Sequence, residues 1–211
     1  MPTLANMEKV NGIVISGAAA PTDRHILLGT QTASSSATLS FSGLNSHRSD
    51  VLRSSFDVLE FRFTNMHPAT DNVDFEFQVN AAGASGFNET ITSTAWDAWH
   101  VEVEDGSGDY NLTYEAVHDQ AQGTGYQPII GYSIGNGNDE SCSGVLTLYA
   151  PSSTTYVTHF TARGTALHYP DAADDAFMAG YINTTGAIDE ISFAMDSGNI
   201  DARMMKGLPS K

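Results

Sequence analysis

One acidic turn has the residue types and spacing of a site for a hard cation. In the segment EDGSGD, oxygen-bearing side chains alternate with glycine at Asp105, Ser107 and Asp109. Carboxylate and hydroxyl oxygens are ligands that Ca²⁺ accepts. A helix-flanked calcium loop would place an acid eleven residues after Asp105, where Ala116 stands, and two glycines between acids are equally typical of a hairpin turn. The sequence leaves open a calcium site or a plain turn, and it predicts no other cofactor.

A second kind of chemistry, stacking on sugar rings, is offered by the two tryptophans in the segment TAWDAWH. Trp99 is in phase with Val101 on a predicted strand and is expected to face the core. Trp96 precedes that strand and is the better candidate for an exposed platform. Tyr110 and Tyr126 are expected to join it in a glycan-binding surface. The alternative is that these aromatic side chains only anchor the core.

Catalytic residue types lack the neighbours that catalysis requires. The 7 histidines are scattered, with no pair at metal-ligand spacing. The single cysteine, Cys142, has no disulfide partner in the chain and no His or Asn at the spacing of a nucleophile. The paired acids Glu102 and Glu104 are expected on a wet strand face, where nothing raises the pKa of a carboxyl. No phosphate-binding loop or nucleophile elbow is present, so the sequence predicts a protein that is not an enzyme.

Short apolar runs separated by polar, glycine-rich turns predict an all-β fold, an antiparallel β-sandwich of jelly-roll type. The predicted strands are His25–Thr32, Ala37–Phe41, Phe56–Asn65, Val73–Asn80, Trp99–Glu104, Tyr110–His118, Ile129–Ile134, Gly144–Tyr149, Thr155–Arg163, Phe177–Ile182, Ile188–Met195 and Ile200–Gly207. Only Asp50–Phe56 and Pro170–Ala179 fit a helical turn or two. Residues Ala81–Trp96 form the longest predicted loop, of the kind that carries binding sites on a rigid sandwich.

The segment Phe56–Asn80 has the strongest strand pattern. Apolar residues alternate with polar ones twice, before and after the connector Asn65–Asn72. Because successive side chains of a strand point to opposite faces, each run presents one apolar face to a core and one charged face to water. We therefore expect two long strands of one antiparallel sheet with a wet face.

Charge is distributed unevenly along the chain. The net charge is −16, and between Arg62 and Arg163 there is no Lys or Arg but there are thirteen Asp and Glu. This block is expected to repel nucleic acid. The chain has no apolar segment near the roughly 20 residues of a membrane span, nor a secretory signal pattern, and we expect a protein with no membrane partner and no export signal of its own.

Residues 1–24 differ from the rest of the chain. They contain one short apolar run, Gly12–Ile15, followed by a Gly-Ala-Ala-Ala-Pro hinge. This composition predicts an N-terminal arm, held by another subunit or partner, before a β-sandwich domain at residues 25–211.

Four segments together carry a resemblance to a known family. They are LANMEKVNGIVISGAA, NMHPATDNVDFEFQV and AGYINTTGAIDEISFAMDSGNID, with DQAQGTGYQPIIGYSIGNGNDESCSGVLTLYAPSSTTYVTHF between the last two. They resemble β-rich structural proteins in virions of tailed phages that infect marine bacteria. The resemblance implies assembly in the host cytoplasm, a place on the outer surface of the virion, and no active site. The family ends on an aliphatic-Tyr-Gly-Leu pattern, of which this chain keeps only Gly207-Leu208.

Two functions are compatible with these observations. The resemblance implies a capsid decoration, cement or head-fibre protein that binds the major capsid protein and forms a homo-oligomer, with a trimer favoured. The residues expected to contact the shell are Lys9, Val10, Ile13, Arg203, Met204 and Lys206. The alternative is a tail-fibre tip that binds host-surface glycan through Trp96, Tyr110 and Tyr126.

Overall fold

The fold consists of β-strands joined by turns. The computed structural model describes residues 7–10, 13–16, 27–44, 57–103, 109–168, 171–201 and 203–210. The strands are β1 (Met7–Val10), β2 (Ile13–Ser16), β3 (Gly29–Ala33), β4 (Leu39–Phe41), β5 (Val58–Met66), β6 (Val73–Ala81), β7 (Ile91–Val101), β8 (Tyr110–Tyr114), β9 (Ala121–Gly123), β10 (Gln127–Ile134), β11 (Cys142–Tyr149), β12 (Thr158–His168), β13 (Ala172–Ile182), β14 (Ile188–Met195) and β15 (Arg203–Ser210). These described residues include no helix that could cross a membrane. The predicted all-β antiparallel sandwich is confirmed, and its jelly-roll connectivity stays a prediction.

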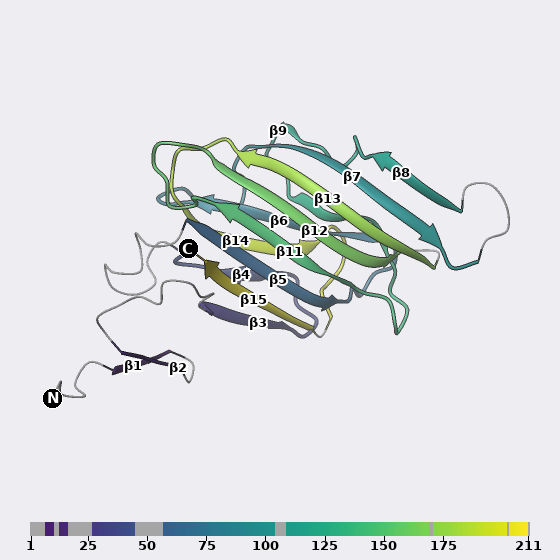
Figure 1. Ribbon diagram of the computed structural model, residues 1–211, viewed down its shortest axis with the longest axis horizontal. Helices are drawn as coiled ribbons and strands as arrows, with labels where there is room; N and C mark the ends of the chain where they lie inside the picture. The colour runs from purple at the N-terminus through teal and green to yellow at the C-terminus, as the bar shows by residue number, and fades with distance from the viewer. Residues whose placement is uncertain are drawn as a thin grey trace.

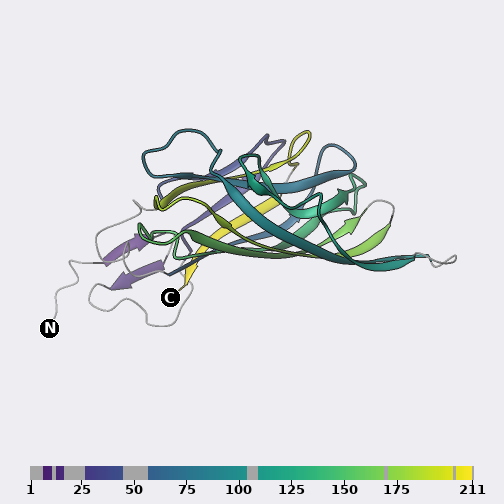
Figure 2. The same cartoon turned by 90° about the horizontal axis from the view of Figure 1, so that it is seen from above.

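Two layers of antiparallel strands face each other. The larger layer has the order β3-β15-β5-β11-β12-β13-β7-β8, with β9 on the same edge of β7 as β8, and the smaller layer has the order β10-β6-β14-β4. One residue pair, Ile134 with His168, joins the layers at a corner. Figure 1 shows the long strands of the larger layer in front of β6, β14 and β4, and Figure 2 shows how strongly they twist.

Phenylalanine rings fill the space between the layers. The ring centroids of Phe63 in the larger layer and Phe75 in the smaller layer are 5.1 Å apart. Those of Phe160 and Phe77 are 5.2 Å apart, in an edge-to-face contact. All four side chains are at most 1% exposed. Such rings dominate the burial of apolar area and prefer tilted or offset contacts, so the predicted inward alternation of both runs in Phe56–Asn80 is confirmed.

The pairing predicted within Phe56–Asn80 is wrong. β5 pairs with β11 and β15, whereas β6 pairs with β10 and β14, so the two strands lie in opposite layers. The connector Asn65–Asn72 crosses from one layer to the other. The wet face is also absent on part of β6, because Gln78 and Asn80 are buried. Gln78 donates hydrogen bonds to the carbonyls of Glu89 and Gly125, which satisfy its buried amide.

Two further predictions need correction. The predicted loop Ala81–Trp96 ends early, because β7 begins at Ile91 and pairs with β13 through all eleven of its residues. The predicted helical turn at Pro170–Ala179 is strand from Ala172, since β12 and β7 flank β13 on both sides. The other predicted turn, Asp50–Phe56, lies outside the described residues.

The N-terminal strands form a sheet of their own. Among the residues that the structure describes, β1 pairs only with β2, in the register Lys9 to Val14 and Val10 to Ile13. In contrast, β15 is an internal strand of the larger layer, between β3 and β5. The end of the chain is therefore part of the sandwich, while β1 and β2 share no strand pairing with it.

Gly180 offers a test of how tightly neighbouring strands of the larger layer pack around the Phe160 ring. A Cβ at Gly180 would lie 2.4 Å from the carbonyl oxygen of Thr92 and 2.6 Å from Cζ of Phe160. Phe160 is its direct partner on β12, so the ring occupies the space that glycine leaves. We expect Gly180→Ala to lower the free energy of unfolding by about 1–3 kcal/mol, measured by urea denaturation. Gly125→Ala is the control, since nothing lies within 4 Å of its added Cβ; equal effects of the two variants would contradict this packing.

Candidate functional site

Two aspartates are buried inside the sandwich without hydrogen-bond partners. Asp97 of β7 and Asp174 of β13 are both 2% exposed, and all four of their carboxyl oxygens are unpaired. They are diagonal neighbours on the inner face, because Asp174 lies opposite Trp99. Burial and then the Glu115 carboxylate raise the pKa of Asp97 to about 6. Burial and then Asp97 raise the pKa of Asp174 to about 7.

A positive charge on His118 acts on both acids and lowers their pKa, against the effect of burial. The loop after β8 carries His118 inward, and its ring lies against Gly131, where a Cβ would be 2.0 Å from the imidazole. Its Nε2 lies 3.4 Å from a carboxylate oxygen of Asp74. Burial opposes a charge on His118, but Asp74, Glu115 and Asp97 outweigh it and raise its pKa. The backbone carbonyl of His118 accepts a hydrogen bond of 2.9 Å from the buried amide of Gln127.

Asp97, Asp174 and His118 form a buried polar cluster. Their pKa values are shifted, as those of catalytic residues often are. A catalytic group must also reach a substrate, and the Asp97 and Asp174 side chains are almost wholly enclosed. Among the residues that the structure describes, no group of three or more His, Cys, Asp or Glu has the arrangement of a metal site. The cluster therefore has its clearest consequence in stability and its dependence on pH.

The outer face of the larger layer is the surface turned away from the smaller layer. On β7, β13, β12 and β11 its side chains come from alternate residues, in register across the four strands. The only Asp, Glu, Lys or Arg at these outward positions are Arg163 and Asp175. Arg163 donates two hydrogen bonds to Asp175, of 3.0 and 2.8 Å, so the Asp, Glu, Lys and Arg side chains at the outward positions of these four strands carry no net charge. The face thus contrasts with a chain whose net charge is −16.

A ridge of three stacked side chains crosses this outer face. Trp96 of β7 lies directly opposite Phe177 of β13, which lies directly opposite Arg163 of β12. We call such a line of directly opposite residues on neighbouring strands a register row. The rings of Trp96 and Phe177 are parallel, at 6° and 4.1 Å between centroids. The guanidinium carbon of Arg163 lies 4.4 Å from the centre of the Phe177 ring, a cation–π contact. We call these three residues the aromatic ridge.

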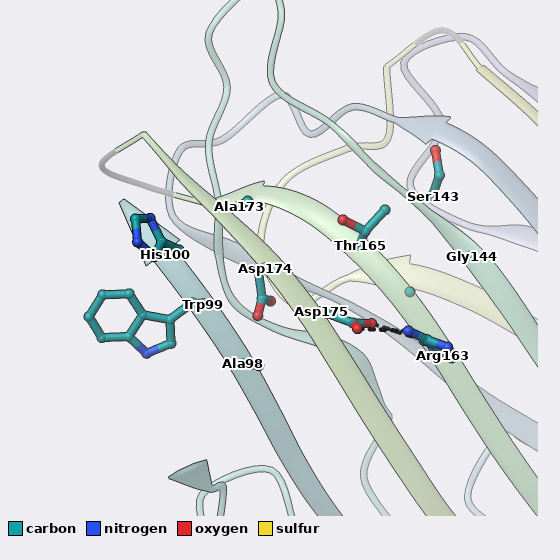
Figure 3. A pocket seen from close by; sticks show the side chains of 11 residues that line it. Ala98, Trp99, His100, Ser143, Gly144, Arg163, Thr165, Ala173, Asp174 and Asp175 are labelled. Atoms are coloured by element: carbon teal, nitrogen blue, oxygen red, sulfur yellow. Dashed lines mark hydrogen bonds and ion pairs between the residues drawn. The ribbon is translucent and has the colours of Figure 1, made fainter. Parts of the chain in front are cut away.

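Small side chains form a hollow on each side of the aromatic ridge. The hollow in Figure 3 has a volume of about 600 Å³, and Ala98, Ser143, Thr165 and Ala173 line it beside the Arg163–Asp175 pair. The opposite hollow has a volume of about 330 Å³ and is lined mainly by threonine and alanine. Both arise because rows of large side chains alternate with rows of small ones.

The predicted glycan residues are only partly brought together. Trp96 is 42% exposed on the outer face, as expected, and Tyr110 is 69% exposed on β8, stacked against His100 with 5.6 Å between ring centroids. Tyr126 precedes β10 of the smaller layer and does not share this face. Trp99 has the inward phase that was predicted, although its side chain is only half-buried.

Phe177, Arg163 and the buried Asp97 and Asp174 were not singled out from the sequence. Phe177 and Arg163 lie 81 and 67 residues from Trp96 along the chain, so strand pairing alone brings them together. Alternation in the segment AADDAFMAG was the one available signal, since it places Phe177 and Asp174 on opposite faces once a strand is assumed.

The other predicted sites are placed as follows. Asp105 and Ser107 of the predicted calcium turn lie outside the described residues, and Asp109 is buried, with its carbonyl bonded to the amide of Val101 at 2.8 Å. The predicted shell-binding residues fall on strands: Lys9, Val10 and Ile13 on β1 and β2, and Arg203, Met204 and Lys206 on β15. Cys142 is buried, which raises the pKa of its thiol.

Comparisons with protein-family models, with curated proteins and with solved structures found no match to this chain.

Proposed function

We propose that this chain is a structural subunit on the outer surface of a phage virion, a capsid decoration, cement or head-fibre protein without catalytic activity. The observation that carries the proposal is the division of the described strands into a sandwich and a separate β1–β2 pair, which within the described residues pairs with none of the sandwich strands. A hairpin of two short strands is marginal in water by itself and gains stability when it packs on another surface. The capsid shell is the surface that we assign to it, with assembly in the host cytoplasm.

The sandwich suits an outward-facing module. Its core needs no disulfide, and the one cysteine is buried. The acidic block between Arg62 and Arg163 supplies repulsion that keeps neighbouring copies from aggregating. A closed symmetric contact, with a trimer favoured, would let the copies bury enough surface for stable attachment.

The end of the chain has a smaller part in this proposal than its sequence indicates. β15 is held between β3 and β5, so Arg203, Met204 and Lys206 belong to a layer of the sandwich. Attachment in this proposal therefore rests mainly on the arm. β15 is an internal strand, and its main role is to hold the larger layer together.

A tail-fibre tip that binds host-surface glycan is the second candidate. The exposed Trp96 and its neighbours on the outer face favour it, because aromatic rings and hydroxyls on one surface suit sugar recognition. The two candidates differ in where the protein sits on the particle and in its copy number.

Deleting residues 1–24 tests the role of the arm. We expect the truncated protein to lose attachment to virions that lack the endogenous protein, because the proposed contact is removed. We expect its free energy of unfolding to stay within about 0.5 kcal/mol of the full chain, because β1 and β2 pair only with each other in the part of the chain that the structure describes. Co-sedimentation with virions and urea denaturation measure the two effects.

The second measurement is the control for a general folding defect. A truncated protein that unfolds as the full chain does and still co-sediments with virions would contradict attachment through the arm.

A further inference from the structure

The smaller hollow on the outer face is a trough that runs across four strands. Its floor is one register row of small side chains, Thr94, Ala179, Thr161 and Thr147. Three gaps between neighbouring strands, each of about 4.8 Å, give this row a length of about 14 Å. We call it the threonine trough.

Taller side chains border the threonine trough along both sides. The aromatic ridge of Trp96, Phe177 and Arg163 forms one border. The other border is the register row Tyr181, His159 and Tyr149. The hydroxyl group of Tyr149 is hydrogen-bonded to Thr161 at 3.0 Å, which joins this second border to the floor. The trough thus has a polar floor between two walls rich in aromatic rings.

The chemistry of the trough matches a neutral sugar chain. Each threonine hydroxyl both donates and accepts hydrogen bonds, as the hydroxyl groups around a pyranose ring do. The aromatic walls present apolar surface to the C–H groups on the faces of such a ring. The volume of about 330 Å³ lies within the range of small-ligand sites.

Charge favours a neutral ligand over a charged one. The single cation of the trough, Arg163, is neutralised by Asp175, and no acid lines the trough. The chain as a whole carries a net charge of −16, which repels anionic polymers. A protein partner would require a much larger apolar contact than a trough floored with hydroxyl groups provides.

We propose that the threonine trough binds a neutral, linear oligosaccharide, whose sugar units lie across β7, β13, β12 and β11 beside the aromatic ridge. The proposal deepens the second candidate function, glycan recognition at Trp96, by naming a ligand class and the residues of the floor, and it is independent of attachment through the arm. It holds wherever the protein sits on a particle, since the site lies within one chain.

Titration of the full chain with defined sugars tests the proposal. The probes are hexasaccharides of β-1,4-linked glucose, α-1,4-linked glucose, β-1,4-linked mannose and β-1,4-linked N-acetylglucosamine, followed by amide chemical shifts and by calorimetry. We expect at least one probe to shift the amides of Thr94, Thr161 and Thr147, and to bind more tightly than its disaccharide, because only the longer chain spans the trough.

Variants then place the site. Trp96→Ala and Thr161→Val are each expected to weaken binding about tenfold, because they remove a wall and a hydroxyl group of the floor. Thr165→Val is the matched control, since Thr165 lies on the same strand and the same face but lines the other hollow; its binding should equal that of the unchanged protein. Thermal unfolding verifies that all three variants are folded.

Four results would overturn the proposal: no binding of any probe, shifts confined to other surfaces, unchanged binding by Thr161→Val, or tighter binding of a sulfated probe than of its neutral counterpart. Sedimentation in which Trp96→Ala dissociates an oligomer would instead assign this face to contact between copies. None of these results bears on attachment to a virion, which the deletion of residues 1–24 tests separately.

Discussion

Lowering the pH from 8 to 5 is expected to raise the free energy of unfolding of this protein by roughly 3–6 kcal/mol. The physical reason is a set of acids whose protonated form is favoured by the fold. Burial is the largest cause for each: it raises the pKa of Asp97 to about 6, and those of Asp174 and Glu76 to about 7. The pKa of Asp196 is raised as well.

The direction follows from proton binding. The unfolded chain has ordinary pKa values of 3.8 for Asp and 4.5 for Glu, so between about pH 4 and pH 7 the folded state binds more protons. Stability must then fall as the pH rises through this window. His118 acts in the same direction, because its raised pKa means that its favourable charge is lost as the pH rises. Urea denaturation at each pH measures the profile, and stability that rises toward pH 8 would contradict it.

Asp174→Asn isolates the largest single contribution to the pH dependence of the free energy of unfolding. The substitution removes a charge that is buried without a hydrogen-bond partner and leaves an amide of the same size. We expect the variant to be more stable than the unchanged protein at pH 8 by about 2–4 kcal/mol and to show a flatter pH profile. Asp175→Asn is the control, because Asp175 forms an exposed pair with Arg163 and such pairs contribute about 0–1 kcal/mol. Equal behaviour of the two variants would refute the assignment to the buried carboxylate.

Phe75→Ala is expected to lower the free energy of unfolding by about 3–5 kcal/mol. Phe75 is 0% exposed, and its ring lies 5.1 Å from Phe63 in the opposite layer and 5.9 Å from Phe193 in its own. Truncation removes one of the ring contacts that join the layers and leaves a cavity that the paired strands on either side cannot close. Urea denaturation at pH 5, where the protein is expected to be most stable, gives the measurement.

Tyr156→Ala is the control for that experiment. Tyr156 is also aromatic, but it is 75% exposed in the turn before β12. We expect its removal to change stability by less than about 0.5 kcal/mol. A loss for Phe75→Ala as small as that for Tyr156→Ala would mean that the phenylalanine contacts between the layers do not hold the sandwich together.

The strands and their inward faces were predictable because alternation is a local property. In Phe56–Asn80 the apolar residues of the two alternating runs are buried, as their phase predicts: Leu59, Phe61, Phe63, Val73, Phe75, Phe77 and Val79. The partners of these strands were not predictable, since the same alternation suits one sheet or two facing ones. The turn Asn65–Asn72 led to the expectation that both strands belong to one antiparallel sheet, whereas β5 and β6 lie in different layers. The first residues of β7 include threonine and serine, which are common in loops. The sequence therefore predicted a loop where β7 begins.

The candidate site likewise combines features that the local sequence predicts with features that depend on which strands pair. Trp96 was expected to be exposed because it was placed before a strand, whereas it lies within β7 and faces outward. Its stacking on Phe177, and the contact of Arg163 with the same Phe177 ring, depend on which strands are neighbours. The burial of Asp97 and Asp174 runs against the general rule that acids stay in water unless they are paired. Only the fold reveals that the inner faces of β7 and β13 carry them into the interior.

Counting the copies of this protein in purified virions tests the central proposal most directly. Quantitative mass spectrometry gives the ratio of this chain to the major capsid protein. A decoration or cement protein follows the symmetry of the shell, so we predict a simple ratio that corresponds to hundreds of copies per particle. A few dozen copies or fewer would instead assign the protein to a tail fibre, and its absence from the particles would contradict the virion role itself.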